Sequence, residues 1–195
     1  MNRTELVAVV RSYLNRPDLP AADITTMIQS VEGELNRALK EHPRNIRRTS
    51  FTLLAANDGL LSMPYDLMQL INLRDANGNL NQYPFDGRDQ AQADGHAFIM
   101  RGMVAELFPA PTVDTSYTLD YYAALRPLAG DFDSNWVSNF FSDLYLYGVL
   151  KESAVYLKND ARLALWQQEF LRRLDGVMGQ GWGQNISSIP RIRIG

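Results

Sequence analysis

Residues 136–158 (WVSNFFSDLYLYGVLKESAVYLK) decide the fold of this chain. Between Trp136 and Leu150 the only charged residue is Asp143, so apolar side chains cover nearly the whole circumference of the expected helix. A helix with this pattern is buried on more than one side. The run is shorter than the roughly 20 apolar residues that a membrane span needs. The stretch therefore predicts a helix that is enclosed by several neighbours.

Three further segments carry apolar residues at helical spacing and can supply those neighbours: residues 3–15, 22–41 and 161–178. Asn2 and Glu5 form a capping-box pattern before the first of these helices. The last has one apolar face, made of Leu163, Trp166, Phe170, Leu174 and Val177. Four main helices are therefore expected.

Between residues 45 and 123 the hydrophobic period changes from 3.6 to 2, which indicates strands. Turn residues at 57–59 and at Asn77 and Gly78 predict hairpins, and Gly102 separates another strand pair. The expected strands are residues 45–54, 60–63, 70–74, 80–85, 96–101, 103–108 and 117–123, with a short helix at 86–93. Successive hairpins of this kind predict an antiparallel β-meander.

The predicted fold class is α+β: an α-helical bundle of four main helices with an inserted antiparallel β-meander and an extended C-terminal arm. The expected bundle core comprises residues 1–44 and 124–178. The inserted β-rich subdomain comprises residues 45–123, and the arm comprises residues 179–195.

The C-terminal arm, residues 179–195 (GQGWGQNISSIPRIRIG), cannot continue the helix before it, because Gly179, Gly181 and Gly183 follow one another closely. We interpret these glycines as a hinge. The rest reads as a lone strand, which needs a partner to be stable. The arm is therefore either frayed or docked on a partner. The residues expected to dock are Trp182, Ile186, Ile189, Pro190, Arg191, Ile192, Arg193 and Ile194.

The aromatic residues of the 136–150 stretch are interpreted as a subunit interface or core, with a ligand pocket as the alternative. They are Trp136, Phe140, Phe141, Tyr145 and Tyr147. Aromatic side chains are enriched at protein interfaces, which favours the first interpretation.

Composition excludes several classes of function. With 195 residues and 46% hydrophobic residues, the chain can build a full core. The absence of cysteine excludes disulfides and thiolate metal sites. A net charge of −3 does not favour tight nucleic-acid binding. The N-terminus lacks the apolar run of a signal peptide, so a soluble, cytoplasmic protein is expected.

No enzymatic signature, metal site or cofactor site is predicted. His42 and His96 stand apart from other potential ligands, which favours surface or turn positions. Residues 131–135 begin like a calcium loop, but Trp136 stands where that loop needs glycine. A polar loop that caps the next helix is the better interpretation. Two carboxylates could still meet in space and form a hydrolase site, so that alternative stays open.

Several segments together resemble one known family. They are residues 31–39 (VEGELNRAL), 61–73 (LSMPYDLMQLINL), 108–111 (FPAP) followed by 117–128 (YTLDYYAALRPL), 135–162 (NWVSNFFSDLYLYGVLKESAVYLKNDAR) and 189–193 (IPRIR). Their content and order resemble the head-to-tail adaptor, or connector, proteins of tailed bacteriophages. One departure is Ser142, where the family commonly has proline, and it leaves open whether residues 136–158 form one helix or break near Asp143.

The resemblance implies a non-enzymatic virion structural protein, made in the host cytoplasm and located at the neck of the virion. It implies a ring, usually of twelve subunits, beneath the portal, which connects the capsid to the tail and extends the DNA channel. The implied partners are other copies of the chain, the portal protein, and tail nozzle or tail fibre proteins. Genomic DNA would pass through without sequence-specific binding, and no membrane is involved. The arm would dock on the portal.

Two alternative functions remain from other classes of protein. One is a tail-associated cell-wall hydrolase, and the other is a generic homo-oligomeric binding module.

Overall fold

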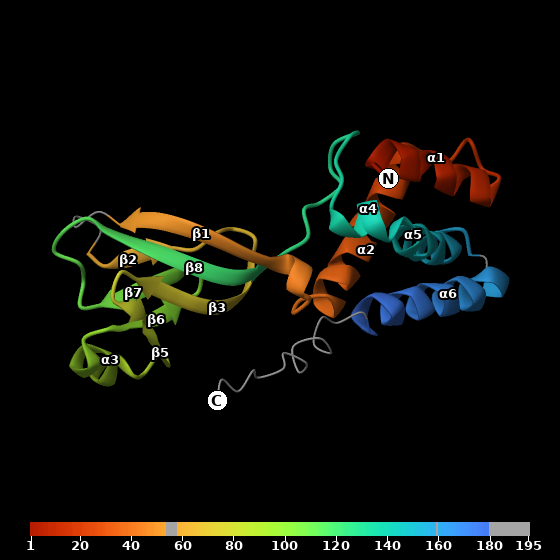
Figure 1. Cartoon of the computed structure of the whole chain (residues 1–195). Coiled ribbons are helices and arrows are strands. Elements are labelled where there is room, and N and C mark those ends of the chain that lie inside the picture. The colour runs from red at the N-terminus through yellow and green to blue at the C-terminus, as the bar shows by residue number, and fades with distance from the viewer. Residues whose placement is uncertain (54–57, 159, 180–195) are drawn as a thin grey trace, which may run out of the picture. The chain divides into compact units, whose positions relative to one another are not determined.

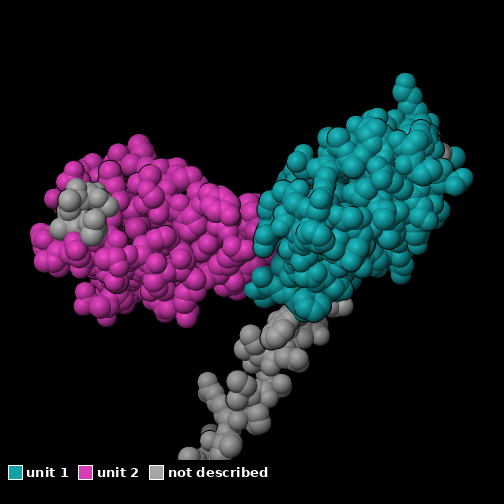
Figure 2. Space-filling model, turned by 90° about the horizontal axis from the view of Figure 1, so that it is seen from above, with its two compact units in different colours: residues 1–44, 125–195 teal, residues 45–124 magenta. Residues whose placement is uncertain are grey.

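The computed structural model describes residues 1–53, 58–158 and 160–179 (Figure 1). The chain divides into two compact units, which Figure 2 colours separately. One unit, here called the helical unit, comprises Met1–Arg44 and Leu125–Gly195, and the other, the β-unit, comprises Asn45–Ala124.

The helical unit holds five α-helices in its described residues: α1 (Arg3–Leu14), α2 (Ala21–Ala38), α4 (Trp136–Phe140), α5 (Ser142–Tyr156) and α6 (Asp160–Gly179). The predicted capping box at α1 is confirmed. The Asn2 side chain accepts a hydrogen bond from the Glu5 N–H at 2.9 Å, and the Glu5 carboxylate accepts one from the Asn2 N–H at 2.9 Å. None of the helices in the described part of the chain combines the length and apolar character that a membrane span requires.

Helix α5 is the centre of the helical unit, because it contacts α1, α2, α4 and α6. Its buried apolar side chains belong to a single core cluster that also includes residues of those four helices. Gly148 marks the closest approach. A Cβ atom at this position would lie 2.7 Å from Val31 Cγ1 of α2 and 3.1 Å from Phe170 Cε2 of α6. Helix α5, whose first half carries one charge only, is therefore enclosed by several neighbours, as its composition predicts.

The helical stretch 136–158 breaks at Phe141, which answers the question that Ser142 left open. Phe141 has φ −135° and ψ 51° and separates α4 from α5. Asn135 begins α4 by accepting a hydrogen bond from the Ser138 N–H at 2.9 Å, so the loop before it caps the helix as expected. Asp143 lies in the first turn of α5, where a negative charge suits the helix dipole.

The β-unit contains two four-stranded sheets and one helix. The first sheet has the order β1-β8-β3-β4 and the second β2-β7-β6-β5. The elements are β1 (Ile46–Leu53), β2 (Leu60–Ser62), β3 (Leu67–Asp75), β4 (Gly78–Asn79), β5 (Asn81–Tyr83), α3 (Arg88–Asp94), β6 (Ala97–Arg101), β7 (Val104–Phe108) and β8 (Thr115–Ala123), preceded by a short 3-10 helix, η1 (Pro43–Asn45).

One apolar cluster joins the two sheets of the β-unit. Tyr117, Leu119 and Tyr121 alternate on β8 and pack in the same cluster as Phe98 of β6 and Leu107 of β7. Strand β6 is buried on both faces, because its neighbouring residues Ala97 and Ile99 pack in a second cluster with Ala91 of α3. Strand β6 is therefore apolar on both faces.

The predicted fold, a four-helix bundle with a small inserted antiparallel meander, is wrong. The described residues form an α+β structure with six helices and two sheets of four strands each. The turn signals identified bends but not strand partners. Strand β2 pairs with β7 rather than with β1, and β1 pairs with β8. These distant pairings place both sheets over one shared core, and that burial outweighs the local hairpin preference. Asn57 of the first predicted turn lies outside the described residues.

The strands that follow the turn at Gly78 also differ from the predicted hairpin. Strand β4 returns beside β3 for two residues only, and β5 then joins the other sheet in a parallel pairing with β6. A meander would have no parallel pair. At the boundaries of the unit, Ile46 of β1 is the register partner of Tyr122 of β8. The chain therefore enters and leaves the β-unit on neighbouring strands.

Gly148→Ala tests the enclosure of α5. The added methyl meets the stiff, β-branched Val31, so overpacking is expected to lower the free energy of unfolding by about 1–3 kcal/mol, despite the better helix propensity of alanine. Gly33→Ala in α2 is the matched control, because its Cβ would meet only Arg37 Nη1 at 3.7 Å. The control is expected to keep or raise the free energy by up to about 1 kcal/mol. Urea denaturation measures both, and equal stabilities would contradict the packing assignment.

Candidate functional site

Aromatic and cationic side chains gather around α4. We call His42, Arg44, Trp136, Phe140 and Phe141 the α4 aromatic cluster. The Trp136 ring stacks on His42 with 4.7 Å between centroids, and it meets Phe141 edge-on at 6.1 Å. The Arg44 guanidinium carbon lies 4.7 Å from the Phe140 centroid and 5.7 Å from the Trp136 centroid. These are cation–π distances.

The outer part of the α4 aromatic cluster is open to solvent. Phe140 is 66% exposed, and Arg44 is also exposed, whereas Trp136 and Phe141 are half-buried. Aromatic residues with arginine are the types that dominate binding energy at protein interfaces. The cluster is therefore the candidate contact surface of the helical unit.

His42 is held neutral inside this cluster. Burial lowers its pKa, and the nearby Arg44 charge lowers it further, while a backbone hydrogen bond with Val177 opposes the shift. His42 Nδ1 accepts a hydrogen bond from the Arg44 N–H at 3.2 Å. His96, the other histidine, lies 3.1 Å from Asp75 through Nε2 and Oδ1. In the described part of the chain, no three histidine or carboxylate groups come together as metal ligands.

A pocket of about 330 Å³ lies between the end of α2 and the end of α6. We call it the α2–α6 pocket. Its lining residues are Arg37, Ala38, Leu39, Lys40, Glu41, His42, Pro43 and Met178. It shares His42 with the α4 aromatic cluster, so the two features are contiguous.

Tyr145 is a core residue with a buried polar network. Its hydroxyl accepts a hydrogen bond from Asn135 Nδ2 at 2.7 Å and donates one to Glu32 Oε1 at 3.3 Å. Glu32 Oε1 also accepts from the Leu128 N–H at 2.7 Å. Burial raises the pKa of Tyr145 far above its usual value, and the Glu32 charge adds to the shift. The hydroxyl therefore stays protonated and remains a donor.

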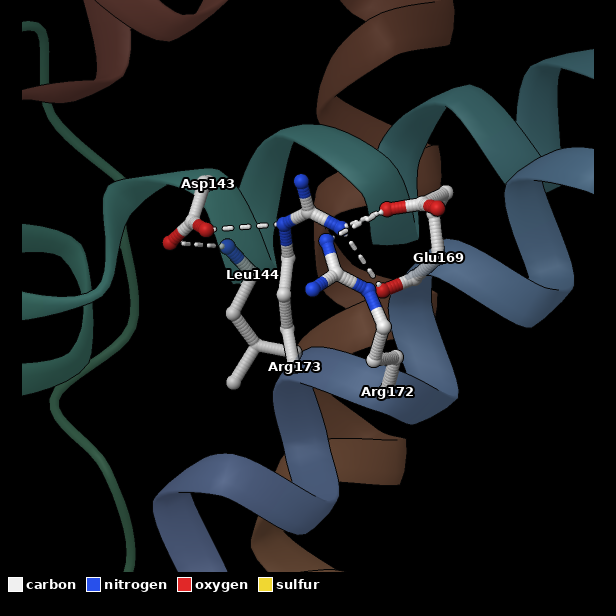
Figure 3. A network of polar contacts seen from close by, with 5 residues as sticks. All are labelled: Asp143, Leu144, Glu169, Arg172 and Arg173. Carbon is white, nitrogen blue, oxygen red and sulfur yellow. Dashed lines mark hydrogen bonds and ion pairs between the residues drawn. The ribbon is translucent and has the colours of Figure 1, made fainter.

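Tyr147 lies beside a second polar network, in which Arg173 joins Asp143 of α5 to Glu169 of α6 (Figure 3). The Arg173 guanidinium lies 3.8 Å from the Tyr147 ring centroid. Its Nε donates to Asp143 Oδ2 at 2.7 Å, and its Nη1 donates to the Glu169 carbonyl at 3.0 Å and pairs with the Glu169 carboxylate. Arg172 reaches only Glu169, at 2.9 Å. Arg173 thus connects the two helices through a charged network.

The structure thus separates the five aromatic residues that the sequence grouped. Trp136, Phe140 and Phe141 meet in the α4 aromatic cluster, Tyr145 lies in the core, and Tyr147 lies at the α5–α6 contact.

Several residues of these sites, among them His42, Arg44 and Glu32, were not identified from the sequence. In the sequence His42 stands apart and Arg44 shows no role, because nothing local links either to Trp136. Glu32 did leave a signal, since it stands one position after Val31 in the apolar stripe of α2, where a carboxylate must be partly buried.

Most of the predicted arm lies outside the described residues. Gly179, one of the three predicted hinge glycines, is the last residue of α6. Gly181, Gly183 and all the predicted docking residues, which are Trp182, Ile186, Ile189, Pro190, Arg191, Ile192, Arg193 and Ile194, fall in the part that the structure does not describe.

Comparison with known proteins places the chain in a family. A model of the SU10 adaptor protein family matches residues 1–192. The chain therefore belongs to this family of phage head-to-tail adaptors, and the resemblance seen in the sequence is confirmed. Among curated proteins, no sequence matches the chain.

The pH dependence of stability tests the Glu32 network. Burial raises the pKa of Glu32, and the hydrogen bonds from Leu128 and Tyr145 oppose the shift. The folded state therefore holds the Glu32 proton more tightly than the unfolded chain does. This contribution to stability is present below the unfolded pKa and is lost as pH rises through the folded pKa. Glu32→Gln removes it.

The free energy of unfolding of wild type, relative to Glu32→Gln, is accordingly expected to fall as pH rises above the ordinary pKa of a glutamate side chain. Denaturant unfolding at several pH values measures the difference. Parallel pH profiles for the two proteins would show that Glu32 is not perturbed by burial.

Arg173→Ala tests the link between α5 and α6. Arg173 is 17% exposed and loses several hydrogen bonds, so the free energy of unfolding is expected to fall by about 1–3 kcal/mol. Arg172→Ala is the matched control, because Arg172 is 66% exposed and its loss is expected to cost less than about 1 kcal/mol. Thermal and urea unfolding compare the two variants, and equal losses would refute a special role for Arg173.

Proposed function

We propose that this protein is a non-enzymatic structural component of the virion neck. In this role it forms a ring of twelve copies beneath the portal, joins the capsid to the tail and extends the DNA channel. The observation that carries the proposal is the family match, which spans residues 1–192 and therefore both units of the chain. Genomic DNA passes through the ring without sequence-specific binding, in keeping with a net charge of −3.

The α4 aromatic cluster is the proposed contact between neighbouring copies in the ring. Phe140 places most of its ring in water, and the Arg44 guanidinium covers only one face of it. Phe132, in the loop before α4, is 87% exposed. Burying such aromatic side chains against a neighbour is favourable, because it removes apolar surface from water. In an isolated subunit these aromatic side chains stay exposed to water, and burying them between subunits contributes favourable free energy to assembly.

The β-unit is the proposed contact for tail nozzle or tail fibre proteins. Tyr65, which follows β2, is almost fully exposed, and Phe85, which follows β5, is largely exposed. Large apolar side chains on the turns of a stable sheet scaffold are suited to binding, because the scaffold holds them in place. The two sheets and α3 supply that scaffold through the β-unit's own apolar clusters.

The arm, residues 179–195, is the proposed portal contact. It begins at the end of α6, carries no acidic residue and ends in alternating isoleucine and arginine. An extended segment with alternate apolar side chains can add to the edge of another protein's sheet, where main-chain hydrogen bonds give affinity. This mode of binding needs no preformed pocket on the helical unit.

Removal of residues 179–195 tests the arm. Both units are expected to stay folded, because the core clusters of the described residues lie within residues 6–177, whereas binding to purified portal is expected to be lost. Circular dichroism checks folding, and a pull-down with portal checks binding. A full-length variant with Trp182, Ile189 and Ile192 replaced by serine is the control for arm length. Portal binding that survives the deletion would refute this role.

Ring formation is measured in the same samples by electron microscopy and native mass spectrometry. The protein alone is expected to be a monomer or weak oligomer, and rings are expected on the portal. Phe140→Asp should weaken ring closure without unfolding the chain, because Phe140 lies on the surface. Hydrolysis of peptidoglycan by the purified protein would contradict the non-enzymatic assignment.

A further inference from the structure

The loop between β8 and α4 is held by the helical unit from its first residue. We call residues 125–135 the strap. Its Leu125 and Leu128 side chains are 5% and 2% exposed and lie in the core cluster of the helices. The Leu125 N–H donates a hydrogen bond to Asn36 Oδ1 at 2.8 Å, and the Leu128 N–H donates one to Glu32 Oε1 at 2.7 Å. Glu32 and Asn36 stand one turn apart on α2, so this helix holds the strap by its backbone.

The residue before the strap is held equally closely by the β-unit. The Ala124 N–H donates a hydrogen bond to the Asp66 carbonyl at 2.7 Å, and the neighbouring Ala123 is buried in the core between the sheets. The Asp66 carboxylate accepts a hydrogen bond from the Tyr121 hydroxyl at 3.1 Å and forms an ion pair with Arg47 at 2.7 Å. Asp66 thus joins β1 to β8 where the chain enters and leaves the β-unit. On its way out, the chain changes unit within a single peptide.

The entry into the β-unit is almost as short. Arg44 is held by the helical unit, since its N–H donates a hydrogen bond to His42 Nδ1 at 3.2 Å and its guanidinium lies over the Phe140 ring. Two residues later, Ile46 is already paired with Tyr122 of β8. Two links therefore join the units: residues 44–46, and the peptide between residues 124 and 125.

Each unit has apolar cores of its own. Every core cluster of the described residues lies wholly within the helical unit or wholly within the β-unit. Units with separate cores commonly move relative to each other, and the hinge is then a few residues that absorb the change in φ and ψ. Two bodies that share two neighbouring links turn about the line through both links. We propose that residues 44–46 and the Ala124–Leu125 peptide form a two-link hinge, about which the β-unit turns while the strap stays fixed on α2.

Spin-label distance measurements test the hinge, because the chain has no cysteine of its own. The variant Gln90→Cys, Gln167→Cys places one label on α3 of the β-unit and the other on α6 of the helical unit. The reference variant Gln29→Cys, Gln167→Cys places both labels on the helical unit, on α2 and α6, and all three glutamines are exposed. The distance distribution of the first pair is expected to be broader than that of the reference pair.

Insertions locate the hinge. Two glycines inserted between Ala124 and Leu125 are expected to broaden the first distribution further, because they add up to about 7 Å of chain at one link. The same insertion between Ala129 and Gly130 is the matched control. It is expected to change nothing, since Leu125 and Leu128 hold the strap before that point. Equal widths for the two label pairs, or equal broadening by the two insertions, would overturn the proposal.

Amide hydrogen exchange measures the fixed end of the strap directly. Asn36→Ala removes the acceptor of the Leu125 N–H, so exchange at Leu125 is expected to become faster by up to about tenfold, which corresponds to the loss of one hydrogen bond. Arg37→Ala, at the next and exposed position of α2, is the control and should leave that rate unchanged. An unchanged rate in Asn36→Ala would show that α2 does not hold the strap. Both experiments use the free chain, so their failure leaves the proposed function untouched.

Discussion

The close approach of three helices at Gly148 is the constraint on which the helical unit depends. Val31 of α2 and Phe170 of α6 press on the same residue of α5 from two sides, and no methyl group fits between them. A helix held this closely is apolar around most of its surface, because most of its side chains between Leu144 and Ala154 are buried. The two outer helices each turn an apolar face to this core. The amphipathic character of α2 and α6 thus follows from the lack of polarity in α5.

The buried polar side chains Glu32 and Tyr145 of this core are hydrogen-bonded. The Tyr145 hydroxyl donates a hydrogen bond to the Glu32 carboxylate, and the Leu128 N–H donates a second one to the same oxygen. Nearer the surface, Arg173 of α6 connects Asp143 of α5 with Glu169 of its own helix. Buried polar groups cost free energy unless they are hydrogen-bonded, so these networks also fix how the helices are placed along one another. Apolar packing sets the distance between the helices, and the networks set their register.

Local features of the fold could be predicted from the sequence, and long-range features could not. The capping box at Asn2 and the two-residue alternation in β8 are encoded within a few positions, and both were found. The partners of β2 and β5 depend on which surfaces become buried when distant segments meet, and no turn signal carries that information. The same holds for the candidate site, where His42 meets Trp136 only when the segment after α2 comes to lie beside α4. Family membership was recoverable because the order of several segments is itself long-range information.

The pairing of Ile46 with Tyr122 has a consequence for how this chain can change over time. Register partners on antiparallel strands lie about 5 Å apart, so the β-unit starts and finishes almost at one point. An insertion with closely spaced ends can be exchanged, enlarged or shortened while the host domain keeps its own core. The β-unit of this chain can therefore be replaced as a single block over evolutionary time, and the core of the helical unit need not change with it.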